Sequence, residues 1–227
     1  MESVNITTII VPRGAEAKAI NRGLQRISGY KPIVLPIPIG SSGLDKWFQE
    51  SQLSKDFLNK TLLMGLAGSL SSAHSVGDVV IYKGCGDGEN KYLECDGEMV
   101  KFLSTILKCG QVKGLTKNVI VAKADKKTEL GKMSGMDVVD MEGLRVLEKL
   151  RGVGMVRVIS DGVDQDLPDI GGAIDLDGNL RPVRLAWEMT KNPFAAWHLI
   201  KGSLRGLRVL ENVTYKLFAC VQDKKSV

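Results

Sequence analysis

The segment MVRVISDGV at positions 155–163 brings together residue types that could do chemistry. It has the pattern of a buried strand that carries Arg157 and ends on Ser160 and Asp161. Residues four apart on one strand point to the same face, so we expect Arg157 and Asp161 to face one cavity. A cationic side chain in an apolar strand needs an anion or a surface, and Asp161 is the nearest anion in the sequence.

Other expected strands also end on polar groups. The first runs into VPRGAE, which holds Glu16, another into GLAGS at 65–69, and a third into Met141 and Glu142. Ligands of open α/β sheets bind beyond the carboxyl ends of strands. We therefore expect one pocket lined by backbone amides of 65–69 and by these side chains: Glu16, Met141, Glu142, Arg157, Ser160 and Asp161. A purely structural role stays open for three acids, with Asp140 as a helix N-cap, Glu142 in a first turn and Asp161 in a turn.

The strands that would position these residues are short apolar runs bounded by Gly, Pro or Asp. They fall at 6–11, 33–39, 61–68, 76–82, 118–122, 137–141 and 155–160. Helical patterns at 15–27 and 142–151 lie between them, and a Gly-rich turn within 79–95 indicates an antiparallel hairpin. The chain is predicted to be a single α/β domain over 1–227, with a mixed, twisted central sheet flanked by helices.

Composition limits the class of protein. The 227 residues are 44% hydrophobic and 25% charged, as in a soluble globular protein, and no run is long enough to cross a membrane. A cytoplasmic location is expected, because the N-terminal apolar run is too short for a secretion signal. The four cysteines and two histidines have no metal-ligand spacing, so neither a metal nor another cofactor is expected.

The net charge of +5 belongs to the C-terminal part, where residues 179–227 hold nine Lys and Arg against three Asp and Glu. A helix predicted at 193–212 places Lys201, Arg205 and Arg208 opposite Trp197, Ile200, Leu204 and Leu207. Such a helix could lie on anionic lipid. A solvated face of a helix packed on the domain is the favoured interpretation. Nucleic acid is not an expected partner, since the basic residues lack the aromatic interleaving of a known binding module.

Three ordered motifs resemble the nucleoside phosphorylase/nucleosidase superfamily. TLLMGLAGSLSSAHSVGDVVIY at 61–82 is similar to its G-x-A-G-G and V-G-D-V-V segment, VDMEG at 139–143 to its V-x-M-E element, and RVISDG at 157–162 to its R-x-x-S-D element. With Glu16, the resemblance covers about residues 6–165. The tail from Asp166 to Val213 is similar to that of hopanoid-associated phosphorylases, which are implied to remove adenine from an adenosylated triterpenoid.

The resemblance implies cleavage of the N-glycosidic bond of a purine nucleoside, with adenine as the expected base. Asp161 matches the acid that protonates the departing purine, and Glu142 matches the carboxylate that accepts the ribose hydroxyls. Met141 is implied to pack on the sugar, with Ala67 and Gly68 beside the substrate. Arg157 and Ser160 match groups that orient the acid. The family also implies a homo-oligomer, either a dimer, a trimer or a hexamer.

The nucleophile depends on the other end of the pocket. Bacterial purine phosphorylases use an arginine after the first strand and an Arg and a Ser in the glycine segment, but this chain has Glu16, Leu63 and Leu66 there. A carboxylate would repel phosphate, and Glu16 resembles the base that activates water in methylthioadenosine/S-adenosylhomocysteine nucleosidases. Hydrolysis is therefore expected. Phosphorolysis, with phosphate as co-substrate, stays an alternative because Arg13 is near in sequence. A non-catalytic nucleoside-binding protein is a further alternative. The presence of Glu16, Glu142 and Asp161 together argues against it, because a protein without activity is free to lose any of them.

Overall fold

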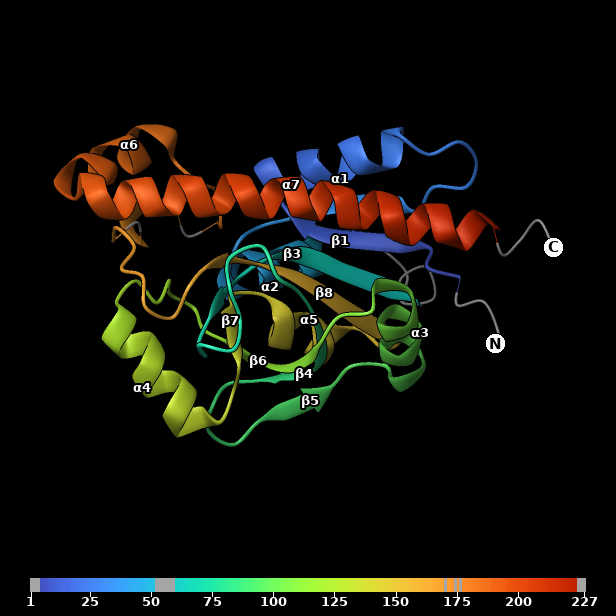
Figure 1. Ribbon diagram of the computed structural model, residues 1–227, viewed down its shortest axis with the longest axis horizontal. Helices are drawn as coiled ribbons and strands as arrows, with labels where there is room; N and C mark the ends of the chain where they lie inside the picture. The colour runs from blue at the N-terminus through green and yellow to red at the C-terminus, as the bar shows by residue number, and fades with distance from the viewer. Residues whose placement is uncertain (1–4, 52–59, 170, 174, 176, 224–227) are drawn as a thin grey trace.

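The computed structural model describes residues 5–51, 60–169, 171–173, 175 and 177–223 (Figure 1). These residues form eight strands: β1 (Thr8–Pro12), β2 (Ile33–Ile37), β3 (Thr61–Ser69), β4 (Val79–Gly86), β5 (Tyr92–Glu94), β6 (Gln111–Thr116), β7 (Val138–Asp140) and β8 (Val153–Asp161). The helices among them are α1 (Ala15–Gln25), α2 (Ser41–Glu50), α3 (Gly97–Leu107), α4 (Ala124–Ser134), α5 (Gly143–Lys149), α6 (Pro182–Lys191) and α7 (Pro193–Asp223), with a short 3₁₀ turn at Gly171–Ala173.

All eight strands belong to one mixed sheet, which confirms the predicted fold class. From one edge the order is β2, β1, β3, β7, β6, β4 and β5, and β8 pairs with both β3 and β4. The pairing of β8 is parallel to β3 and antiparallel to β4. Since β4 pairs with β6, β6 with β7 and β7 with β3, five strands close into a ring. Closure removes the free edges of these strands, and only β5 and β2 are left as outer edges.

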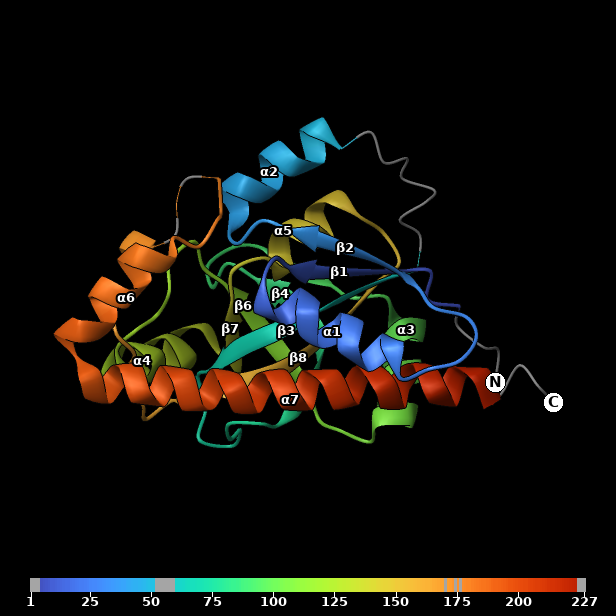
Figure 2. The same ribbon diagram turned by 90° about the horizontal axis from the view of Figure 1, so that it is seen from above.

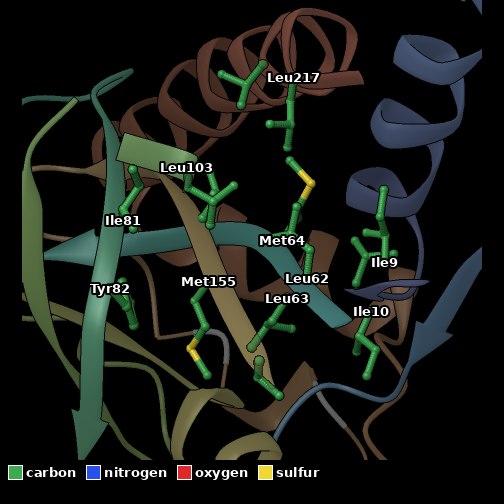
Figure 3. Packing of buried hydrophobic residues seen from close by; sticks show 14 of the residues in the cluster. Ile9, Ile10, Leu62, Leu63, Met64, Ile81, Tyr82, Leu103, Met155 and Leu217 are labelled. Carbon is green, nitrogen blue, oxygen red and sulfur yellow. The ribbon is translucent and has the colours of Figure 1, made fainter. Parts of the chain in front are cut away.

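The core fills both faces of the central strands. Ile9, Leu62, Met64 and Met155 are completely buried between the strands and the covering helices (Figure 3). Strands that are buried on both faces have continuous apolar runs rather than alternating ones. That is why β1, β3 and β8 could be recognised in the sequence.

Helices α1 and α7 lie side by side along one side of the sheet (Figures 1 and 2). Their backbones approach closely at Gly23, where an added Cβ would stand 2.5 Å from the carbonyl oxygen of Glu211. A similar approach joins α7 to β8, since a Cβ on Gly202 would stand 2.0 Å from the carbonyl oxygen of Ser160. The long C-terminal helix is therefore packed directly against the strand that carries the candidate acid.

One predicted strand is wrong. Residues 118–122 are irregular, and the neighbouring strand is β6 at Gln111–Thr116. The apolar run Val119–Val121 lines a cavity instead of joining the sheet. β6 escaped prediction because its sequence QVKGLT has no run of apolar residues: Val112 and Leu115 are separated by two other residues, and Lys113 is exposed. The predicted helices at 15–27 and 142–151 are present as α1 and α5, and the predicted hairpin is the antiparallel pair β4 and β5.

The predicted C-terminal helix is present as α7, but its faces differ from the expectation. Lys201 was expected opposite Trp197, yet its Nζ lies 4.5 Å from the centre of that indole ring. The reason is that residues four apart share a helix face. Trp197, Ile200 and Leu204 are about half exposed, so this part of the helix presents an apolar surface. No helix among the described residues is long and apolar enough to span a membrane.

Candidate active site

A cavity of about 240 Å³ opens where β1, β3, β7 and β8 end. It brings together seven of the eight side chains or backbone positions predicted for the site: Glu16, Ala67, Gly68, Met141, Glu142, Ser160 and Asp161. The remaining wall is mostly apolar and comes from Pro12, Ile39, Leu66, the irregular segment Val119–Val121, Val139, Leu167 and Leu199, with Asp140 as a further acid. The predicted residue outside the lining is Arg157.

Glu16 stands in the first turn of α1 and reaches across to β3. Its Oε1 accepts a hydrogen bond of 2.7 Å from the backbone amide of Leu66. Burial, with repulsion from Glu142 as a smaller cause, raises the pKa of Glu16 from 4.5 to about 7. A carboxyl in this range changes its protonation near neutral pH, which is the property required of a general base.

Arg157 is completely buried on β8, and its partners are not the predicted one. Its Nη2 donates to Asp140 Oδ2 at 2.8 Å and to Glu142 Oε2 at 3.3 Å. The expected contact with Asp161 is therefore wrong. Nε and Nη1 of Arg157 have no hydrogen-bond partner among the described residues. An added Cβ on Gly65 would meet both Arg157 Nη1, at 2.4 Å, and Glu16 Oε1, at 2.7 Å. Glycine at this position thus leaves room for a cation and a carboxylate to approach β3 together.

Glu142 is held by the backbone as well as by this cation. Its Oε1 accepts a hydrogen bond of 3.3 Å from the amide of Gly40. Burial raises the pKa of Glu142, an effect that Arg157 opposes and Asp140 reinforces. Asp140 also caps α5, because its Oδ1 accepts from the amide of Gly143 at 3.1 Å. The N-cap position of α5 is Glu142 and not Asp140 as predicted, although Asp140 supplies the side-chain hydrogen bond to the first amide of the helix. Glu142 itself turns toward the cavity.

A β-bulge in β8 explains why Arg157 and Asp161 do not share a partner. Ala67 of β3 pairs with Ile159, but the next residue, Gly68, pairs with Asp161, so Ser160 is an extra residue in β8. In a regular strand, successive side chains point to opposite faces, and a bulge interrupts that alternation. Here both Ser160 and Asp161 line the cavity, and Ser160 Oγ lies 2.7 Å from Asp161 Oδ1.

Lys127 on α4 was not among the predicted site residues. This side chain is completely buried, and its Nζ donates to Asp161 Oδ2 at 2.6 Å. The sequence around it, AKADKKTEL, holds five lysines and acids among nine residues, which is the composition of a solvated helix end. The signal in the sequence is that this helix has few apolar residues, so that a lysine stem must cover part of its inner face.

The lining of the cavity contains carboxylates but no lysine or arginine among the described residues. Arg13, which was the reason to keep phosphate as an alternative, does not line it. Its Nη1 lies 3.4 Å from Asn179 Oδ1 on the outside of the domain. Four acidic side chains, Glu16, Asp140, Glu142 and Asp161, therefore face a space in which a phosphate ion would find no cationic side chain.

Comparison with solved structures shows that this is the fold of nucleoside N-glycosidases. The 5′-methylthioadenosine/S-adenosylhomocysteine nucleosidase of Helicobacter pylori superposes with a TM-score of 0.65 at 15% identity, over 98% of this chain and 100% of that one. Futalosine hydrolase of the same organism superposes with a TM-score of 0.66 at 14% identity, over 93% of this chain and 96% of that one. The 5′-methylthioadenosine/S-adenosylhomocysteine nucleosidase of Neisseria meningitidis superposes with a TM-score of 0.66 at 12% identity, over 94% of this chain and 98% of that one. No family model matches the sequence, and no curated protein sequence is significantly similar.

Proposed function

We propose that the protein hydrolyses the N-glycosidic bond of a purine nucleoside, with adenine as the base. The observation that carries this proposal is the placement of Glu16 and Asp161 in one cavity whose lining offers carboxylates and no cation. Glycoside cleavage through an oxocarbenium-like state needs a group that activates water on one side of the sugar and an acid that protonates the leaving group on the other.

Glu16 is the proposed base. With a pKa of about 7, it is largely ionised in mildly alkaline solution and basic enough to take a proton from water. Arg157 Nη1 lies on the same side of Gly65 as Glu16 Oε1, so this buried cation favours the ionised form of the base. Arg157 also fixes Glu142, which we assign to the ribose hydroxyls because a buried carboxylate held by a cation and a backbone amide is a rigid acceptor.

Asp161 is the proposed acid, and its proton goes to N7 of the purine as the bond to the sugar breaks. Ser160 fixes one oxygen of this carboxyl through the 2.7 Å contact with Oδ1. Met141, which lines the same cavity between Asp140 and Glu142, is assigned to the face of the sugar. The apolar remainder of the wall supports a substrate with a non-ionic 5′ substituent, such as a methylthio group.

The test is to incubate the protein with methylthioadenosine, adenosylhomocysteine, adenosine and inosine, each with and without phosphate, and to measure free base and free sugar. We expect base release that is independent of phosphate, with free ribose and no ribose 1-phosphate as the second product. Base release that requires phosphate would overturn the assignment of Glu16. An Asp161→Asn variant as fast as the wild type would overturn the assignment of the acid.

A further inference from the structure

Lys127 has no place in the mechanism above, although it makes the shortest contact to the proposed acid from outside β8. Its ammonium group has three N–H donors, and all three are used: Asp161 Oδ2 at 2.6 Å, the carbonyl of Gly162 at 3.0 Å and the carbonyl of Gln165 at 2.9 Å. Completely buried lysines are rare unless they are paired. This one is paired with a single carboxylate, and that carboxylate lines the cavity.

The chain after β8 is arranged around this ammonium group. The carbonyls of Gly162 and Gln165 both turn toward Lys127, and the side chain of Gln165 accepts from the amide of Gly162 at 3.1 Å. A second link joins the same loop to α4 without touching Asp161: Asp166 accepts from the amide of Ala124 at 2.9 Å and pairs with Lys123. Asp166 therefore holds the loop to α4, and Lys127 holds the acid.

We propose that Lys127 is a positioning residue that acts through Asp161, by stabilising the carboxylate that forms when the acid gives up its proton. This inference rests on the proposed function. In the chemical step the O–H bond of Asp161 breaks and the N7–H bond of the purine forms, while the electron pair stays on the carboxylate. Negative charge thus develops at Asp161 in the transition state, next to a fixed ammonium group. Solvent returns the proton to Asp161 after the base has left.

Other charged groups also lie around this pair. From α4 and the loop after β8 these are Lys123, Asp164 and Asp166, and from the opposite walls of the cavity they are Glu16, Asp140 and Glu142. Lys127 is the cation in hydrogen-bond contact with Asp161. The other cation, Lys123, forms an ion pair with Asp166.

The first experiment compares Lys127→Met and Lys127→Gln, which remove the charge, with Lys127→Arg, which keeps it. Thermal unfolding identifies the variants that fold, and Lys127→Gln can still donate to one of the loop carbonyls. On the nucleoside that the wild type cleaves, kcat is expected to fall about 100-fold in the uncharged variants and less than about tenfold in Lys127→Arg. The loss in the uncharged variants is expected in kcat and not in KM, because Lys127 does not line the cavity and acts on the step in which charge develops at Asp161.

The second experiment uses p-nitrophenyl β-D-ribofuranoside, whose leaving group needs no proton. If Lys127 acts through the acid, the uncharged variants keep most of the wild-type rate on this substrate. Gln165→Leu is the control, because it removes the hydrogen bond of that side chain to the amide of Gly162 in the same loop without changing any charge. It is expected to keep the wild-type ratio of the rates on the two substrates.

Equal losses on both substrates, or a loss confined to KM in a folded uncharged variant, would reduce Lys127 to a structural link and overturn the proposal. A wild-type protein that releases no base from any nucleoside would instead overturn the proposed function, and the role of Lys127 with it. The two failures are thus told apart by the wild-type assay alone.

Discussion

Arg157 on β8 donates a hydrogen bond of 2.8 Å to Asp140 at the end of β7, with both side chains buried. The two strands have no direct pairing, so this ion pair bridges the interior of the strand ring between them. The same guanidinium reaches Glu142 at 3.3 Å, which places a single cation between a residue that caps α5 and a residue of the cavity. The side chain of Arg157 therefore both bridges two strands of the fold and holds a residue of the candidate site.

Arg157→Met is expected to lower the free energy of unfolding by about 3–5 kcal/mol, because it leaves a buried carboxylate without its cation. Urea denaturation measures this change. Arg22→Met is the matched control, since Arg22 is about half exposed in its pair with Glu211 and should lose less than about 1 kcal/mol. A loss of similar size in both variants would contradict the assigned role of the buried pair.

Glu16 gives the activity an acidic limb. Because its pKa is raised to about 7 and the base must be ionised, kcat/KM of the wild type should rise with pH through that value and level off above it. Glu16→Gln removes the base and is expected to lower kcat by about 10²- to 10⁴-fold. A pH series of initial rates measures both effects, and an acidic limb near pH 4.5 would show that Glu16 is not the titrating base.

The same carboxyl should make stability depend on pH. A folded-state pKa raised from 4.5 to about 7 means that the folded protein holds the proton more tightly than the unfolded chain. Its contribution is fully present below pH 4.5 and is lost as pH rises through about 7. Glu16→Gln should therefore raise the free energy of unfolding by about 1–3 kcal/mol at pH 8 relative to its effect at pH 4. Thermal melts of both proteins at the two pH values measure this effect. A stability difference between Glu16→Gln and the wild type that is the same at both pH values would contradict the prediction.

Gly68→Ala should damage activity more than folding. The new Cβ would stand 2.8 Å from Asp161 Oδ2 and 3.3 Å from Val139 Cγ1, so the carboxyl must move while the backbone need not. A displacement of this kind is expected to cost about 100-fold in kcat. Gly97→Ala is the control, because nothing lies within 4 Å of its added Cβ at the start of α3. Kinetics and melting curves of the two variants separate the effects, and a fully active Gly68→Ala protein would contradict the assigned position of the acid.

Much of the fold could be predicted because the central strands are buried on both faces. Apolar runs such as those of β1, β3 and β8 have few alternatives in a chain of this size. β6 was missed because its sequence QVKGLT has no run of apolar residues. Residues 118–122 were mistaken for a strand because an apolar run that lines a cavity has the same composition as one in a sheet. The composition of a segment indicates that it is buried, but it does not distinguish burial within a sheet from burial along the wall of a cavity.

The site was predictable to the extent that it lies at strand ends. The positions of Glu16, Glu142 and Asp161 in one cavity follow from strand boundaries and the crossing topology. The partners of Arg157 and Asp161 could not be predicted, since they depend on one extra residue in β8 and on a lysine brought from α4. Neither a register shift nor a contact between distant segments leaves a local mark on the sequence.

The bulge at Ser160 makes the length of β8 as important to the site as its composition. Removal of Ser160, the one residue between Ile159 and Asp161, would abolish the bulge together with the hydroxyl that lies 2.7 Å from Asp161 Oδ1. An added residue at this point would move Asp161 out of its pairing with Gly68. The turn between β4 and β5, at 87–91, has no such constraint. Insertions and deletions among homologues should therefore accumulate at that turn and spare the last few residues of β8, even where the residues themselves have diverged.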